Sequence, residues 1–138
     1  QETGLYDKMV VASQRGVVVN LYTDYHFNST TKNIFDESKA AKFQRSCEQL
    51  NSDGINVFVV NGVHSKLVMA DKRFMSVGSF NWCSAARTGK YANMETSMIY
   101  SGNLVEEITL QVNTLKARLK KSYLIDEISK KNEHHALL

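Results

Sequence analysis

The order of local patterns in the first half of the chain most constrains its fold. A helical spacing of apolar residues ends at Gly16, and an apolar, β-branched segment follows at residues 17–22. A second helical pattern starts with Asp36 as an N-cap and ends at Gly54, just before another apolar segment at residues 55–60. Helices that alternate with short apolar segments predict an α/β fold with buried strands.

The second half predicts a hairpin, a further strand and a long helix. Residues 64–81 indicate two strands, and residues 94–100 indicate a third. Asn103 can cap a helix whose apolar stripe consists of Leu104, Ile108, Val112, Leu115 and Leu119. We expect a mixed β-sheet flanked by helices, in a single domain over residues 1–138. The 138 residues, 43% of them hydrophobic, suit one core, whereas two would be hard to fit.

The composition restricts the cellular compartment and the binding partners that we expect. No run approaches the roughly 18 apolar residues of a membrane span, and the first residues lack a signal pattern. We therefore expect a soluble, cytoplasmic protein. Gln1 stands where an initiator Met would be, so we also expect a C-terminal fragment of a longer protein. Cys47 and Cys83 lack a Cys-x-x-Cys spacing, which suggests neither a zinc site nor a disulfide framework. A net charge of +3 permits an anionic partner without implying nucleic acid.

The hairpin places polar residues inside an apolar stretch. If residues 71–72 form a two-residue turn, antiparallel partners have numbers that sum to 143, and His64 lies opposite Ser79. Because paired and alternate residues share a face, Lys66 and Asn81 then join His64 and Ser79 in one cluster. The apolar residues divide between the opposite face and a floor beside the cluster: Leu67, Met69 and Phe74 opposite, Val68 and Val77 beside it. A register shift of one residue would scatter the cluster.

The residue types in this cluster suit a phosphodiester. Lys66 supplies a permanent cation, Ser79 and Asn81 supply neutral donors, and Gly78 permits a close approach of backbone or ligand. His64 can act as a nucleophile near neutral pH, and attack on phosphorus forms a phosphohistidine. No carboxylate cluster for magnesium accompanies these residues, so we expect neither a metal nor another cofactor.

The motif resembles the signature of a known superfamily. It reads His-x-Lys, four residues, Asp, six residues, Gly-Ser-x-Asn, and consists of His64, Lys66, Asp71, Gly78, Ser79 and Asn81. This pattern resembles that of the phospholipase D superfamily, and the Trp82 that follows fits it. Glu95 resembles the family acid that hydrogen-bonds the catalytic histidine. The segments QRGVVVNLYTD, NGVHSK and GSFNWCSAARTGKYANMETS also resemble a phospholipase D-like domain at the C-terminal end of some bacterial helicase-like proteins.

The resemblance implies an active site built from two such motifs, one histidine attacking and the other protonating the leaving oxygen. This chain carries one motif. We therefore expect a homodimer that completes the site, or a partner motif elsewhere in the parent protein. The family half-domain also begins with a strand before its first helix, and Gln1 starts too late to include that strand.

Several candidates keep two interpretations. Asp71 is expected to fix the turn, whereas Glu95 is either an orienting acid or a solvated charge. His26, in a loop that leaves a strand end, either contacts substrate or lies on the surface. Arg87 and Lys90 could hold flanking phosphates or occupy a solvated turn. Phe80 and Trp82 are either packing residues or rings that stack on bases. Residues 116–131 form either a surface that binds a polyanion or a solvated helix face. We expect His134 and His135 to belong to the chain end.

Three functions follow from these patterns. The first is a metal-independent phosphodiesterase that cleaves nucleic acid, preferentially DNA, through a phosphohistidine. The second is a module that grips the nucleic-acid backbone for an attached helicase with little turnover. The third is the same enzyme acting on a phospholipid. Turnover separates the module from the enzymes, and substrate competition separates the two enzymes.

Overall fold

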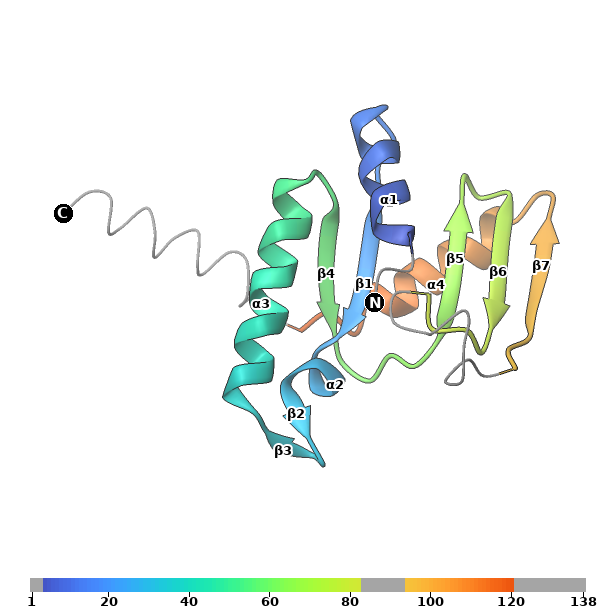
Figure 1. Cartoon of the computed structure of the whole chain (residues 1–138). Coiled ribbons are helices and arrows are strands. Elements are labelled where there is room, and N and C mark those ends of the chain that lie inside the picture. The colour runs from blue at the N-terminus through green and yellow to red at the C-terminus, as the bar shows by residue number, and fades with distance from the viewer. Residues whose placement is uncertain (1–3, 83–93, 121–138) are drawn as a thin grey trace. The chain divides into compact units, whose positions relative to one another are not determined.

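The computed structural model describes residues 4–82 and 94–120 (Figure 1). The chain divides into two compact units. The first contains Gln1–Val17 and His64–Ala117, and the second contains Val18–Val63 and Arg118–Leu138. Parallel and antiparallel strand pairs are both present alongside helices, which confirms the predicted α/β class. Among the described residues, none of the helices has both the length and the apolar character that crossing a membrane requires.

The second unit contains a parallel strand pair and a helix. Strand β1 (Asn20–Asp24) pairs in parallel with β4 (Asn56–Val60), and helix α3 (Glu37–Ser52) lies between them in sequence. Ile55 and Val60 are fully buried there. Cys47 of α3 is buried as well, and desolvation raises the pKa of its thiol to about 11. This cysteine therefore behaves as a core residue and not as a reactive thiol.

The chain after β1 folds more regularly than the sequence predicted. The expected strand at residues 17–22 begins only at Asn20 and continues to Asp24. The expected loop contains helix α2 (Tyr25–Ser29) and a small antiparallel pair, β2 (Thr30–Thr31) with β3 (Ile34–Phe35). The physical reason is the Asp24 carboxylate, which accepts hydrogen bonds from the amides of Phe27 at 2.8 Å and Val63 at 3.0 Å. The Asp24 side chain therefore caps α2 and also binds Val63 in the loop that follows β4.

The first unit contains an antiparallel sheet and two helices. Its strands are β5 (Lys66–Ala70), β6 (Phe74–Gly78) and β7 (Ser97–Ser101), in that order across the sheet. Helix α1 (Leu5–Gln14) precedes them in sequence, and α4 (Val105–Lys116) follows and lies along one face of the sheet (Figure 1). Ile108 and Leu115 are the buried residues of α4. The N-cap is Leu104, one residue after the expected Asn103, whose side chain accepts a hydrogen bond from the Val105 amide at 3.4 Å.

The hairpin turn corrects the predicted register. Asp71 and Lys72 have φ of 52° and 55°, and the Arg73 amide donates to the Ala70 carbonyl at 3.0 Å, as in a two-residue type I′ turn. However, Ala70 pairs with Phe74, so Arg73 is an extra residue and partner numbers sum to 144. The carbonyls of Lys72 and Arg73 accept from the amides of Leu104 and Gly102, both at 2.9 Å. The chain between β7 and α4 thus holds the extra residue outside the β5–β6 ladder.

The shifted register changes which side chains share a face. Lys66 is paired with Gly78, and Leu67 with Val77. We predicted that Val77 shares a sheet face with Lys66 and that Phe74 lies on the other face. This prediction is wrong, because the one-residue shift exchanges the two faces of β6.

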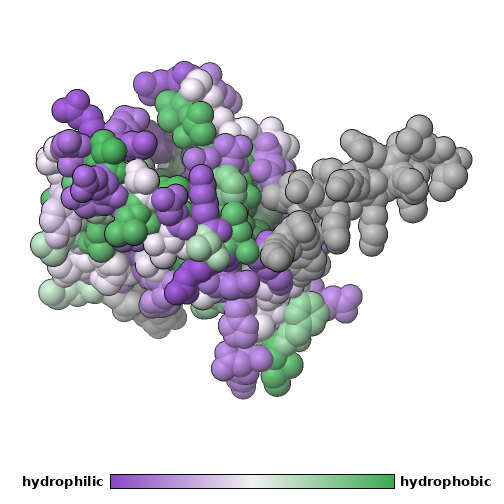
Figure 2. Space-filling model, turned by 180° about the vertical axis from the view of Figure 1, so that it is seen from behind, coloured by the Kyte–Doolittle hydropathy of each residue, from purple (hydrophilic) through white to green (hydrophobic). Residues whose placement is uncertain are grey.

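On the face seen in Figure 2, hydrophobic side chains are interspersed with hydrophilic ones, as is usual for a protein surface.

Candidate active site

The motif residues meet at the open end of the β5–β6 hairpin. His64 comes two residues before Lys66, the first residue of β5, and Ser79 follows Gly78, the last residue of β6. Because Lys66 and Gly78 are direct partners, the ladder brings His64, Lys66 and Ser79 to the same end. Ser79 lies beyond β6, so its position does not follow from strand alternation alone. The predicted pairing of His64 with Ser79 is wrong, because Lys66 pairs with Gly78 and the register is shifted by one residue. The two residues nevertheless lie at the same end of the hairpin.

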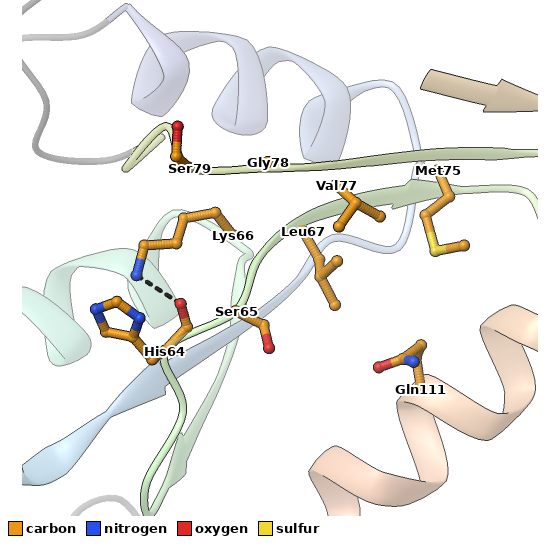
Figure 3. A pocket seen from close by; sticks show the side chains of 9 residues that line it. All are labelled: His64, Ser65, Lys66, Leu67, Met75, Val77, Gly78, Ser79 and Gln111. Atoms are coloured by element: carbon orange, nitrogen blue, oxygen red, sulfur yellow. Dashed lines mark hydrogen bonds between the residues drawn. The ribbon is translucent and has the colours of Figure 1, made fainter. Parts of the chain in front are cut away.

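A hollow of about 470 Å³ lies at this end of the first unit (Figure 3). His64, Lys66 and Ser79 line it together. The other lining residues are Ser65, Leu67, Met75, Val77, Gly78 and Gln111. His64 and Ser79 are exposed and Lys66 is half-buried, so a solute can reach all three side chains. The structure thus places an imidazole, a cation and a serine around one hollow.

Lys66 is held beside His64. Its Nζ donates a hydrogen bond to the main-chain carbonyl of His64 at 2.5 Å, and Figure 3 shows the ammonium group directed toward the imidazole. This bond uses one of the three protons of the ammonium group, which leaves two for phosphate oxygens. A fixed cation next to the imidazole is suited to an anionic substrate that the imidazole attacks.

Ser79 is positioned by the approach to β7. Its Oγ donates to the Glu95 carboxylate and accepts from the Thr96 amide at 3.2 Å, while its own amide donates to the Thr96 carbonyl at 3.1 Å. These contacts continue the pairing of Gly78 with Ser97 by one residue. The described residues show no hydrogen bond between Glu95 and His64. The structure therefore places Glu95 on the serine instead of on the histidine.

Gly78 is required by the neighbouring backbone. A Cβ at this position would lie 2.5 Å from the Thr96 carbonyl oxygen and 2.7 Å from the Ser97 Cα. Both distances are shorter than van der Waals contact, so a side chain would push β7 away. The sequence suggested that Gly78 permits the close approach of either backbone or ligand, and the structure shows the close approach of the β7 backbone.

Other predicted residues lie apart from the hollow. Asp71 is exposed in the turn at the opposite end of β5, which agrees with a role in the turn. Asn81 is exposed and does not line the hollow. His26 belongs to the second unit, where its Nε2 lies 3.3 Å from Asn33 Oδ1. The remaining predicted positions lie outside the described residues: Cys83, Arg87, Lys90, His134 and His135.

Gln111 is a lining residue that the sequence analysis missed. It lies on α4 three residues after Ile108 and four before Leu115, which are both buried. These spacings place it on the apolar face of the helix, where a polar side chain is unusual. A glutamine within an apolar stripe was the signal that could have identified it.

Within the described ranges, no three His, Cys, Asp or Glu side chains gather as potential metal ligands.

Comparison with protein families gives a match over most of the chain. A family model described as cardiolipin synthase, phospholipase D-like domain, matches residues 1–117 of the 138. No curated protein and no solved structure gives a significant match. The match supports the superfamily inferred from the motif, and with it phosphodiester chemistry as the general activity. A chain that matches this model over most of its length, and gathers His64, Lys66 and Ser79 around one hollow, belongs to the phospholipase D-like family.

Proposed function

We propose that this chain is a metal-independent phosphodiesterase that cleaves nucleic acid, preferentially DNA, through a phosphohistidine on His64. The observation that carries the proposal is the hollow in which His64, Lys66 and Ser79 meet, with the Lys66 ammonium directed toward the histidine (Figure 3). The net charge of +3 is compatible with a polyanionic substrate. Attachment to a helicase in a longer parent protein is part of the proposal.

The chemistry proceeds in two displacements. A neutral ring nitrogen of one His64 attacks phosphorus, forming an N–P bond while the bond to the leaving oxygen breaks. A second imidazole, which begins protonated, gives its proton to that oxygen. Water then attacks phosphorus, transferring a proton back to the second imidazole and releasing the first. Lys66 stabilises the charge on the equatorial oxygens, and Ser79 adds a donor when its hydroxyl proton turns from Glu95 to the phosphate.

Two imidazoles are needed because one group cannot be neutral and protonated in the same step. The chain carries a single motif, so the second His64 comes from a second copy of the chain in a homodimer. The alternative source is a partner motif in the parent protein. Glu95 acts in either arrangement through the contact that the structure shows, by fixing the Ser79 hydroxyl.

A phospholipid is the second candidate substrate. The matching family model carries the name of a phospholipid-processing enzyme, cardiolipin synthase, which favours a lipid phosphodiester as the alternative. The two candidates share the same attack on phosphorus and differ only in the groups attached to it. A nucleic-acid-binding module without turnover is the non-enzymatic alternative.

The test compares substrates in the absence of free metal. The purified chain is incubated in EDTA with labelled DNA and RNA oligonucleotides and with phosphatidylglycerol vesicles. We expect cleavage of the oligonucleotides and an acid-quenched covalent adduct. His64→Ala should remove the adduct and lower the rate at least about a hundredfold. Lys66→Ala should weaken both binding and rate, whereas Lys8→Ala, an exposed lysine of α1, is the charge-matched control.

Each contrary outcome has a distinct meaning. Activity that disappears in EDTA and returns with magnesium would overturn the mechanism. Hydrolysis of vesicles alone would select the phospholipid candidate. Oligonucleotide binding without any cleavage would select the binding module.

A further inference from the structure

The hollow beside His64 has two chemically different parts (Figure 3). His64, Lys66 and Ser79 form its polar end. Away from them, Leu67, Met75 and Val77 form an apolar wall, and Gln111 contributes a carboxamide from α4. Leu67 and Val77 are direct partners in the ladder, and Met75 is two residues from Val77, so all three share the sheet face toward α4. Lys66 lies on the other face of β5, so the polar end and the apolar wall meet where the hairpin opens. A phosphodiester held at the polar end can reach the apolar wall with one of its substituents around this open end.

Gln111 is the residue that limits what this substituent can be. It is half-buried on the apolar face of α4, next to Ile108 and Leu115, which are 6% and 9% exposed. In the described part of the chain no hydrogen bond engages its carboxamide, which Figure 3 shows directed into the hollow. Water can satisfy this amide while the hollow is open. A substituent that displaces the water has to supply hydrogen bonds in its place, because an unpaired buried amide is costly.

We propose that the hollow holds the nucleobase next to the cleaved phosphate, with the Gln111 carboxamide hydrogen-bonded to the edge of that base. The inference rests on the proposed function and names the substrate group that this site selects. A base has flat apolar faces that pack on Leu67, Met75 and Val77, and an edge with donors and acceptors. Glutamine offers one acceptor and two donors, a set that pairs with adenine through two hydrogen bonds.

An acyl chain fits the same hollow less well. It would pack against Leu67, Met75 and Val77, but it has no group that can replace the water on Gln111. Burial of the unpaired amide would then oppose binding. The position of one polar residue in an otherwise apolar wall thus favours a base over a lipid tail.

The test measures cleavage of single-stranded oligonucleotides of equal length that carry one of the four bases, or no base, beside the cleaved phosphate. We expect the wild-type chain to have a higher kcat/KM on its preferred base, adenine, than on the abasic strand. Gln111→Leu should reduce this ratio by about ten- to a hundredfold, the discrimination of one bidentate base contact. Asn113→Leu, the same kind of amide-to-leucine change at an exposed position of α4 outside the hollow, should retain the ratio.

A second substitution at position 111 removes the amide donors and preserves the shape of the side chain. Gln111→Glu offers only acceptors when ionised, and should move the preference toward cytosine, whose exocyclic amino group is a donor. Equal kcat/KM on all strands in the wild-type chain, or an equal loss on all strands in Gln111→Leu, would overturn the base contact while leaving the phosphodiesterase intact. Absence of cleavage on every strand, with the chain folded by circular dichroism and dimeric by sedimentation, would overturn the proposed function and the inference together.

Discussion

Where β6 ends, Ser79 makes one hydrogen bond to Glu95 and two to Thr96. The hydroxyl proton is directed to the Glu95 carboxylate, so the orientation of this hydroxyl depends on an acid sixteen residues further along the chain. Lys66 is constrained in a similar way by the carbonyl of His64. Lys66 keeps two ammonium protons free, and a preorganised cation of this kind stabilises charge in a transition state without a reorganisation cost at the moment of reaction.

A double-mutant cycle tests which residue Glu95 serves. Ser79→Ala removes one donor and should lower kcat about a hundredfold. If Glu95 acts through Ser79, adding Glu95→Gln to Ser79→Ala should cause no further loss. Losses that multiply in the double mutant would instead assign Glu95 to His64, the role that the family resemblance implies. Steady-state kinetics of the four proteins provides the measurement.

At the scale of elements, α3 and β6 depend on single residues in different ways. Asp36 caps α3 by accepting from the Lys39 amide at 3.0 Å, and it also accepts from Thr31 Oγ1 at 2.9 Å. Gly78 lets β7 approach β6 closely. Asp36 accepts hydrogen bonds from groups close to it in sequence, whereas Gly78 is required because a strand distant in sequence packs against it.

The cap of α3 should make stability depend on pH. The Lys39 amide and then the Thr31 hydroxyl hold the pKa of Asp36 below its ordinary value of 3.8. A carboxylate with a lowered folded-state pKa stabilises the fold fully above its unfolded-state pKa, and loses that effect as pH falls through the folded-state pKa. Asp36→Ala should therefore lower the urea midpoint at pH 7, and the difference from wild type should shrink below about pH 4. Glu37→Ala is the neighbouring control. A difference that does not change between pH 7 and pH 3 would contradict this assignment.

The close approach of β7 predicts the effect of a single methyl group. Gly78→Ala should destabilise the chain by about 1–3 kcal/mol, because the new Cβ overlaps the Thr96 carbonyl oxygen and Ser97 backbone. It should also lower activity, since Ser79 and Glu95 are positioned by the same strand contact. Ser101→Ala, at the other end of β7, is the control. Denaturation curves measure the stability, and an unchanged midpoint for Gly78→Ala would show that β7 does not approach β6 this closely.

At the scale of the whole molecule, the main proposal concerns assembly. One copy of the motif supplies one His64, whereas the proposed reaction uses a nucleophile and a proton donor at once. A symmetric dimer would supply two identical histidines whose protonation differs only after substrate binds.

Mixing experiments test this assembly. Wild-type chains mixed with an excess of His64→Ala chains should lose more activity than dilution explains, as mixed dimers form. Wild-type chains mixed with Lys8→Ala chains serve as the control for exchange and dilution. Sedimentation at the assay concentration shows which species is present. A monomer that cleaves at the full rate would exclude the dimer, and an inactive monomer would direct attention to a partner motif in the parent protein.

The sequence by itself determined the features that depend on neighbouring residues. The cap at Asp36, the helix end at Gly54 and the turn at residues 71–72 all follow from hydrogen bonds and backbone preferences within a few residues. The motif likewise identified the superfamily, because its spacing is written in a single segment of eighteen residues.

Tertiary structure decided the features that depend on distant residues. Arg73 shifts the hairpin register because its carbonyl accepts from Gly102, which no pattern within the hairpin reveals. Glu95 contacts Ser79 because β7 pairs with β6, and Gln111 reaches the hollow because α4 lies along the sheet. Such contacts depend on packing between elements, and one sequence carries no local record of which elements will meet.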